Sequence, residues 1–332
     1  MTGALLLTVL GAALSTVALH SWLPLVPVGL LVTTSGLGLF QVVVFHHCSH
    51  STVFKRPDPG KRDLNVLIGR LISAIVLFKH FDLYKRGHML HHNHSKLLTE
   101  EDEFADFVFN TCGLDTGVPH AVLRRRVLSN LVSPRFHAGF LIRRLRAAWA
   151  SHDRRHNLTG MATWAAVGAG ALATGQVPAF LIGWVLPVTI LLQMATVGRI
   201  LCEHSFPESE LIASRGKDFA SHATGGVFPG TVPPAALAGS PHGLVVWLAW
   251  WANMLIAQVL GRVFVLIGDA PCHDYHHNKP ASRGWTGYIQ ARQRDMESTV
   301  GSLAGYSETW GLFRAVDHTL ASLSRLPPGT VI

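Results

Sequence analysis

Two long stretches of this 332-residue chain carry no charged side chain: residues 1–45 and residues 157–198 contain no Asp, Glu, Lys or Arg. A helix that crosses a bilayer needs about 20 apolar residues, so each stretch can hold two spans. We expect one helical hairpin over residues 3–20 and 25–45, and a second over residues 159–174 and 177–197. The small residues in the first member of each pair suit close packing between helices in a membrane.

The composition also favours a membrane protein. The chain is 48% hydrophobic and only 14% charged, whereas an average globular domain is about 25% charged. We predict an all-α integral membrane protein, a single domain over residues 1–332, with four transmembrane helices as two hairpins plus interfacial helices and a cytoplasmic helical cap. Because no charged leader and cleavage site precede the first apolar run, we expect it to be retained as a span.

The distribution of Lys and Arg sets the expected orientation. Residues 46–156 hold 18 of the 28 Lys and Arg residues, and the turn inside each hairpin holds none. Since positive residues favour the cytoplasmic side, residues 46–157 and 198–332 are expected there. Four cysteines without a CxxC pair fit that reducing compartment. The net charge of +8 suits contact with anionic lipid headgroups, although basic clusters also bind nucleic acid.

Three histidine clusters lie beside the apolar segments: His46/His47/His50, His88/His91/His92 and His273/His276/His277. Positions i, i+3 and i+4 share one face of a helix, so each cluster can direct two or three imidazoles at a common centre, with His47 pointing elsewhere. Neutral imidazole is the commonest metal ligand. Eight such ligands exceed the four that a single zinc ion takes, so the clusters predict two metal ions.

A fourth pair, His152 and His156, repeats the spacing of His46 and His50 and also borders a span. Arg154 lies between the two histidines, together with Arg155, and a metal ion would repel both charges. This pair therefore fits a lipid-facing basic collar better than a metal site.

Two further apolar stretches, residues 64–81 and 243–268, contain polar or charged residues such as Arg70 and Arg262. If either stretch crossed the bilayer alone, histidine clusters on its two sides would lie in different compartments. A shared metal site forbids this, so we expect both stretches to lie in the interface or to re-enter without crossing. The alternative, favoured by length, is that residues 243–268 span the membrane and the last cluster belongs to no common site.

At these residues the chain resembles the membrane fatty acid desaturase and hydroxylase superfamily. Its hallmark is three histidine boxes of the forms HxxxH or HxxxxH, HxxHH and HxxHH, separated by helical hairpins, and the resemblance covers about residues 25–280. By this resemblance, box one is His46 and His50, box two is His88, His91 and His92, and box three is His273, His276 and His277. It implies a non-haem di-iron centre that activates O2 as co-substrate. His47 stands where many members carry an acid, which leaves its role open. The acids of residues 100–106 also match the family, and are otherwise a solvated charge run.

Members of this superfamily commonly need one more histidine between the second and third boxes. The segment GRILCEH at residues 198–204 resembles the RxxxEH sequence found there, which implies His204 as the ninth ligand and Glu203 as an acceptor orienting a ring N–H. His242, in a loop-like SPHG setting, is the rival. The implied metal ligands are His46, His50, His88, His91, His92, His204, His273, His276 and His277.

The resemblance implies an oxidoreductase that acts on an unactivated C–H bond of a fatty acyl or other lipid substrate. A fatty acid desaturase is the first expectation, and a hydroxylase or monooxygenase of an aliphatic or carotenoid substrate is the alternative. The chain has no flavin fingerprint and too few cysteines for its own iron–sulfur cluster. We therefore expect an external ferredoxin-, rubredoxin- or cytochrome-type donor, which would dock on the arginines of residues 124–126 and 143–146.

Two other classes of membrane protein are less compatible with the sequence. A membrane metal transporter needs ligands inside its spans, and residues 3–45 offer His20 alone. A membrane zinc protease would carry His-Glu-x-x-His, which the chain lacks. Repeated HxxHH motifs therefore favour an enzyme.

Overall fold

The computed structural model describes the chain except for residues 56, 59, 217, 236–238, 299–304 and 331–332. Helices form nearly all of the regular structure in this described part. Its sheet has two short parallel strands, β1 (Gly226–Phe228) and β2 (Glu308–Trp310), with Val227 opposite Thr309. The chain is an all-α integral membrane protein, as the composition predicts.

Four helices of the described part are long and apolar enough to cross a membrane: Thr2–Ser21, Leu23–Ser49, Val177–Glu203 and Pro241–Val265. The first three coincide with the spans expected over residues 3–20, 25–45 and 177–197. The expected span over residues 159–174 forms a helix, α9 (Arg154–Ala173), but this helix begins with the polar segment RRHN and is not among the four candidates. The fourth candidate, Pro241–Val265, instead overlaps the stretch of residues 243–268, which is expected not to cross.

The first hairpin packs closely along its length. Helix α1 (Thr2–Ser21) turns through η1 (Leu23–Leu25) into α2 (Val26–Leu39), η2 (Phe40–Phe45) and α3 (His46–Ser49), which run on as one helix. A Cβ atom at Gly11 would clash with the backbone of Thr33, and one at Gly36 with the backbone of Thr8. Such close backbone approach is typical of helix pairs in membranes.

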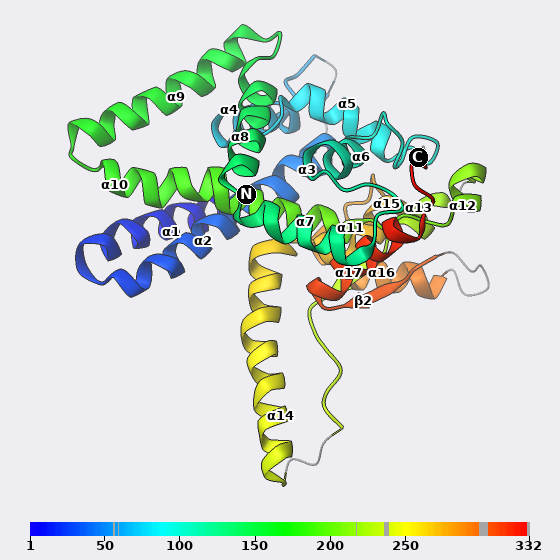
Figure 1. Cartoon of the computed structure of the whole chain (residues 1–332). Helices are drawn as coiled ribbons and strands as arrows, with labels where there is room; N and C mark the ends of the chain where they lie inside the picture. Colours follow the sequence, from blue (N-terminus) through cyan, green and yellow to red (C-terminus); the bar gives the residue numbers. More distant parts are fainter. Residues whose placement is uncertain (56, 59, 217, 236–238, 299–304, 331–332) are drawn as a thin grey trace.

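A second hairpin consists of α9 and the helix built from α10 (Val177–Phe180), η4 (Leu181–Val185), η5 (Pro187–Leu191) and α11 (Leu192–Glu203). Its turn and the turn of the first hairpin extend to the same side of the molecule in Figure 1. By contrast, α14 (Pro241–Ala252), with η6 (Asn253–Gln258) and η7 (Gly261–Val265), projects transversely to α1 and α2. Its apolar side chains are largely exposed: Val245 is 64% and Leu255 is 65% exposed.

The remaining helices form a cap at the opposite side from the hairpin turns (Figure 1). They are α4 (Leu64–Val76), α5 (Phe81–His91), α6 (Glu103–Asp106), η3 (Phe107–Thr111), α7 (His120–Val132), α8 (Pro134–Trp149), α12 (Ser209–Ser214), α13 (Phe219–Ala223), η8 (Ala270–Cys272), α15 (His273–Asn278), η9 (Gly284–Gly287), α16 (Tyr288–Ser298) and α17 (Leu312–Arg325).

The cap begins with a sharp corner and has its own apolar core. Helix α4 has 13 residues, too few to cross a bilayer alone. Leu77 adopts a left-handed conformation at its end, and α5 leaves at an angle of 106°. Fully buried leucines such as Leu123, Leu201 and Leu320 join α7, α11 and α17. These contacts hold α11, which ends at His204, against α7 and α17.

Candidate metal centre

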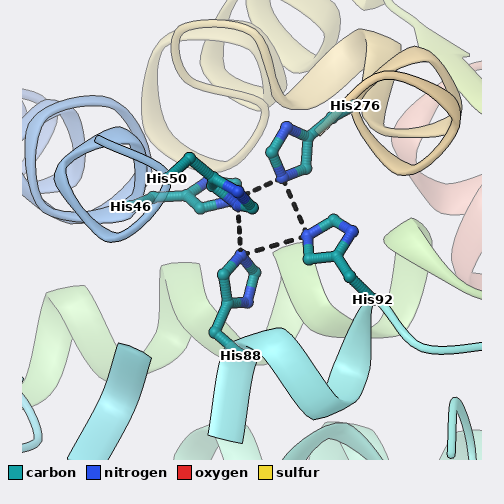
Figure 2. Close-up of side chains that lie close together, drawn as sticks. All are labelled: His46, His50, His88, His92 and His276. Carbon is teal, nitrogen blue, oxygen red and sulfur yellow. Dashed lines mark hydrogen bonds between the residues drawn. The ribbon is translucent and has the colours of Figure 1, made fainter. Parts of the chain in front are cut away.

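All nine predicted ligands come together in two groups of imidazoles, in which the possible ligand atoms lie within 4.8 Å of one another. The first group, called here group one, contains His46, His50, His88, His92 and His276; group two contains His91, His204, His273 and His277. Figure 2 shows how the rings of group one converge from α3, α5 and α15. Segments more than 200 residues apart thus meet at one site.

The backbone just before box one directs His46 into the site. Over Phe40–Phe45 the helix widens to a π-helical turn, a feature frequent at functional sites. The Nδ1 of His46 lies 3.1 Å from the carbonyl oxygen of Val42, one turn earlier. Because Nδ1–H donates to this carbonyl, Nε2 presents its lone pair to the centre of group one.

The nitrogen spacing in group one fits shared metal ligation better than hydrogen bonding. Nε2–Nε2 distances are 2.8 Å for His46–His276, 3.0 Å for His276–His92, 3.2 Å for His92–His88 and 2.9 Å for His88–His50 (Figure 2). A neutral imidazole has one ring proton, which it can donate in only one such contact. Neutral rings therefore cannot form hydrogen bonds in all four of these connected contacts. Metal–nitrogen bonds of about 2.1 Å would hold neighbouring ligands about 3.0 Å apart.

Group two combines two histidines of the third box with one from each of two other helices. His204 ends α11, and its Nε2 lies 3.0 Å from Nε2 of His273. The buried Nδ1 of His204 and both ring nitrogens of His277 have no hydrogen-bond partner among the described residues. Buried polar atoms without partners are costly, and a bound metal ion would satisfy those that face the centre.

Asp102 supports group two, although no sequence pattern distinguishes it from the other acids of its run. Its carboxylate is fully buried, lies 2.9 and 3.0 Å from Nδ1 of His91, and accepts the backbone N–H groups of Leu98 and Phe104. Burial raises the pKa of Asp102, but the His91 ring and these N–H groups outweigh it, so the net pKa is lowered. An ionised Asp102 holds the proton of His91 on Nδ1 and leaves Nε2 free for a metal.

Glu203, the acceptor that the resemblance implied, lies next to the third box but is held by another partner. Its carboxylate lies 3.9 Å from Nδ1 of His273, beyond hydrogen-bond distance. Both of its oxygens accept from Arg199 at 2.8 Å. Glu203 therefore places negative charge beside group two without a direct hydrogen bond to the ring.

A buried ion pair fixes the third box. Asp274, between His273 and His276, is fully buried and accepts from Arg292 of α16 at 3.0 and 3.1 Å. Arg292 also bonds Glu308 of β2 at 2.7 Å. Because the short helix α15 has only six residues, these bonds to neighbouring elements hold its histidines in place.

His47 belongs to neither group, although it lies in box one. Its ring is buried, stacks on Trp285, and its Nε2 lies 2.8 Å from the Asp269 carboxylate. Many members of the superfamily that the sequence resembles carry an acid at the position of His47. Here the histidine at this position pairs with Asp269, from the segment before box three. This contact ties the first box to the third.

The other candidate histidines lie outside both groups. His242 is exposed at the beginning of α14. His152 is exposed, and His156 packs against His80 and bonds the carbonyl oxygen of Ala148 at 3.1 Å. Among the described residues, none of these three takes part in a potential metal-binding group.

Burial keeps the clustered imidazoles neutral. It lowers the pKa of His88, His92, His276 and His277 well below the usual 6.5, and the neighbouring histidines lower it further. Neutral imidazole is the form that binds metal ions. Nine imidazoles with two nearby carboxylates are a donor set suited to two divalent ions such as iron.

Comparison with known proteins agrees with this geometry. The model of the family described as Fatty acid desaturase matches residues 20–232. No curated protein matches the chain. The matched region includes boxes one and two and His204 but ends before the third box, which the structure places against the other two. Because the match extends over more than half of the sequence, the chain belongs to the fatty acid desaturase family.

Proposed function

We propose that this protein holds two irons and uses O2 to oxidise an unactivated C–H bond of a fatty acyl or similar lipid substrate. The observation that carries the proposal is the convergence of nine imidazoles, eight of them buried and His92 half-buried, in two adjacent groups. Group one would hold one iron and group two the other. The irons would supply the oxidising power that no side chain has, and the chain's residues would hold the ligands, position the substrate and exclude water.

We infer desaturation as the first reaction and hydroxylation as the second. In desaturation, two C–H bonds break, a C=C bond forms, and O2 with two electrons and two protons gives two waters. In hydroxylation, one C–H bond becomes C–OH and one water forms from the same inputs. Mass spectrometry of lipids from a host that expresses the chain distinguishes them: a loss of two hydrogens or a gain of one oxygen. A His91→Ala variant should abolish either change.

The position of the histidines supports a topology with two crossing hairpins. His204 follows directly on the helix Val177–Glu203 and lies with His91 in group two, so the chain must cross an even number of times between them. If Val177–Glu203 crosses, α9 therefore crosses as well. His273 also lies with His204, so Pro241–Val265 cannot cross alone between them. Its exposed apolar surface and transverse direction suit a helix lying in the cytoplasmic interface.

Labelling of single cysteines tests this topology in intact cells. A membrane-impermeant maleimide should label a cysteine at Gln176, in the turn after α9, from outside the cell. A cysteine at His242, at the start of α14, should be labelled only after lysis. External labelling at position 242 would contradict the topology. The native cysteines, all buried, serve as the background control.

The electrons would come from a separate protein. Arg124, Arg125 and Arg143 are exposed on α7 and α8 and could steer an acidic ferredoxin-, rubredoxin- or cytochrome-type donor. Turnover with such a donor should fall with rising ionic strength. A rate independent of salt would instead favour lipid headgroups as the partner of this surface.

A further inference from the structure

One cavity opens onto both histidine groups. It has a volume of about 260 Å³ and lies between η2, α5, α6, α8 and α11. His46 and His88 of group one and His91 and His273 of group two belong to its lining. A substrate that reaches both metal positions would therefore lie in this cavity.

The size of the cavity limits the substrate. A cavity of about 150 Å³ accepts benzene, with its six heavy atoms, so a volume near 260 Å³ would hold about ten heavy atoms. An eight-carbon fatty acid has this size, whereas a sixteen-carbon acid has about eighteen heavy atoms. The enclosed part of the cavity therefore suits a short acyl chain.

The lining combines six Phe and Tyr residues with three carboxylates and three Lys or Arg residues, and one of these three cations has no acidic partner. Phe45, Phe78, Phe107 and Phe140 supply apolar surface for an alkyl chain. Arg144 of α8 also belongs to the lining and donates to the backbone carbonyls of Val76, Leu77 and Val188 at 3.0, 3.1 and 2.6 Å. Arg144 therefore does not belong to the exposed basic surface expected over residues 143–146.

Arg144 keeps donor capacity and charge. A guanidinium group has five N–H donors, and the three carbonyls take three of them. Burial lowers the pKa of Arg144 to about 10, which leaves it protonated at neutral pH. The other cations of the lining are paired, Lys79 with Glu103 and Arg199 with Glu203. Among the described residues of the lining, Arg144 alone lacks a carboxylate within ion-pair distance.

We propose that the cavity binds a short, anionic acyl substrate whose carboxylate pairs with the Arg144 guanidinium while its alkyl chain lies along the aromatic wall toward the two histidine groups. This inference rests on the proposed function and narrows its substrate class. It differs from a long-chain or neutral lipid substrate in both length and charge. Arg144 is then a residue that determines specificity and positions the substrate.

Binding to the purified, metal-loaded full-length protein in detergent tests the proposal without turnover. Isothermal titration should show that octanoate binds at least about tenfold more tightly than methyl octanoate, because a hydrogen bond to a charged group is worth that much. Palmitate should bind at least about tenfold more weakly than octanoate, because the cavity cannot enclose its chain. Equal or tighter binding of palmitate or of the ester would overturn the proposal.

Variants of single residues test whether Arg144 causes the preference for octanoate over its ester. Arg144→Gln should remove the preference for octanoate over its ester, Arg144→Lys should retain part of it, and Arg143→Gln on the exposed side of α8 should leave it unchanged. Phe140→Ala, one turn before Arg144, should shift the tightest binding to longer acids. If Arg144→Gln fails to fold, the comparison of ligands on the unmodified protein still decides.

Different experimental results would contradict this inference and the proposed function. A protein with two irons that oxidises palmitate but does not bind octanoate would contradict the substrate class alone. A protein that binds octanoate as expected but holds no iron would contradict the proposed function alone.

Discussion

The two histidine groups differ in how the chain supports them. Group one has five imidazoles, and His46 is oriented by a backbone carbonyl. Group two has four imidazoles, and two buried carboxylates lie beside it: Asp102 bonded to His91, and Glu203 near His273. A carboxylate bonded to a ligand ring raises its basicity and offsets metal charge. Group one thus relies on ligand number, and group two on the charge around its ligands.

Loss of one ligand from each group should have the largest effect. His276→Ala and His204→Ala should each abolish substrate oxidation and lower the iron content below two per chain, because each change removes one imidazole from its group and weakens the binding of that group's ion. Iron analysis and a lipid oxidation assay measure this. His242→Ala and His152→Ala are the controls and should keep both iron and activity. A His204→Ala protein with full iron would exclude His204 as a ligand.

Removal of the Asp102 carboxylate should have the next largest effect and should act on group two. Asp102→Asn should weaken iron binding by about 10- to 100-fold, the usual cost of losing a partner that orients a metal ligand. Iron competition with a chelator gives the affinity. His47→Gln is the matched change beside group one, where the ring at position 47 is not a ligand, and should cost less. An Asp102→Asn affinity equal to that of the unmodified protein would refute the difference between the groups.

Glu203→Gln should separate fold stability from metal binding. It leaves the half-buried Arg199 without its charged partner, which lowers the free energy of unfolding by up to about 3 kcal/mol, so Tm should fall clearly. Because Glu203 lies 3.9 Å from His273, the iron affinity of the folded protein should change less than in Asp102→Asn. A loss of iron larger than that of Asp102→Asn would contradict the assignment.

Lowering the pH should gradually release both metal ions from the protein. The pKa values of His88, His92, His276 and His277 are lowered in the folded chain from 6.5. Below pH 6.5 the unfolded chain therefore binds more protons than the folded one, and stability falls as pH drops further. The Tm of the metal-free protein should therefore fall as the pH drops below about 6.5. The metal-loaded protein should lose iron over the same pH range. A Tm constant from pH 7.5 to pH 5 would contradict burial of these rings in the neutral state.

The spacing of the histidines predicts much of the site, because i, i+3 and i+4 positions share a helix face wherever the helix lies. His204 is predicted from the RxxxEH sequence in which it stands. The roles of Asp102 and Arg144 could not be read in this way. Asp102 stands in an acidic run that looks solvated, and Arg144 in a basic run that looks exposed. Which member turns inward depends on tertiary packing: Asp102 caps α6 at its buried end, and Arg144 meets carbonyls at the end of α4.

The prediction of the membrane-crossing helices from local sequence is limited in the same way. Three predicted spans coincide with long apolar helices, because the absence of charge over about 20 residues is itself the physical requirement for crossing. Hydropathy ranks Pro241–Val265 above α9, yet the shared site favours α9 as the crossing helix. That choice depends on where His204 and His273 meet, which is a long-range contact that no local pattern encodes.

Metal analysis of the purified full-length protein tests the central claim most directly. Elemental analysis combined with Mössbauer spectroscopy after growth on ⁵⁷Fe should find about two irons per chain, in two nitrogen-rich environments that differ as groups one and two differ. One zinc per chain, or no metal in protein that is folded by Tm, would contradict the account.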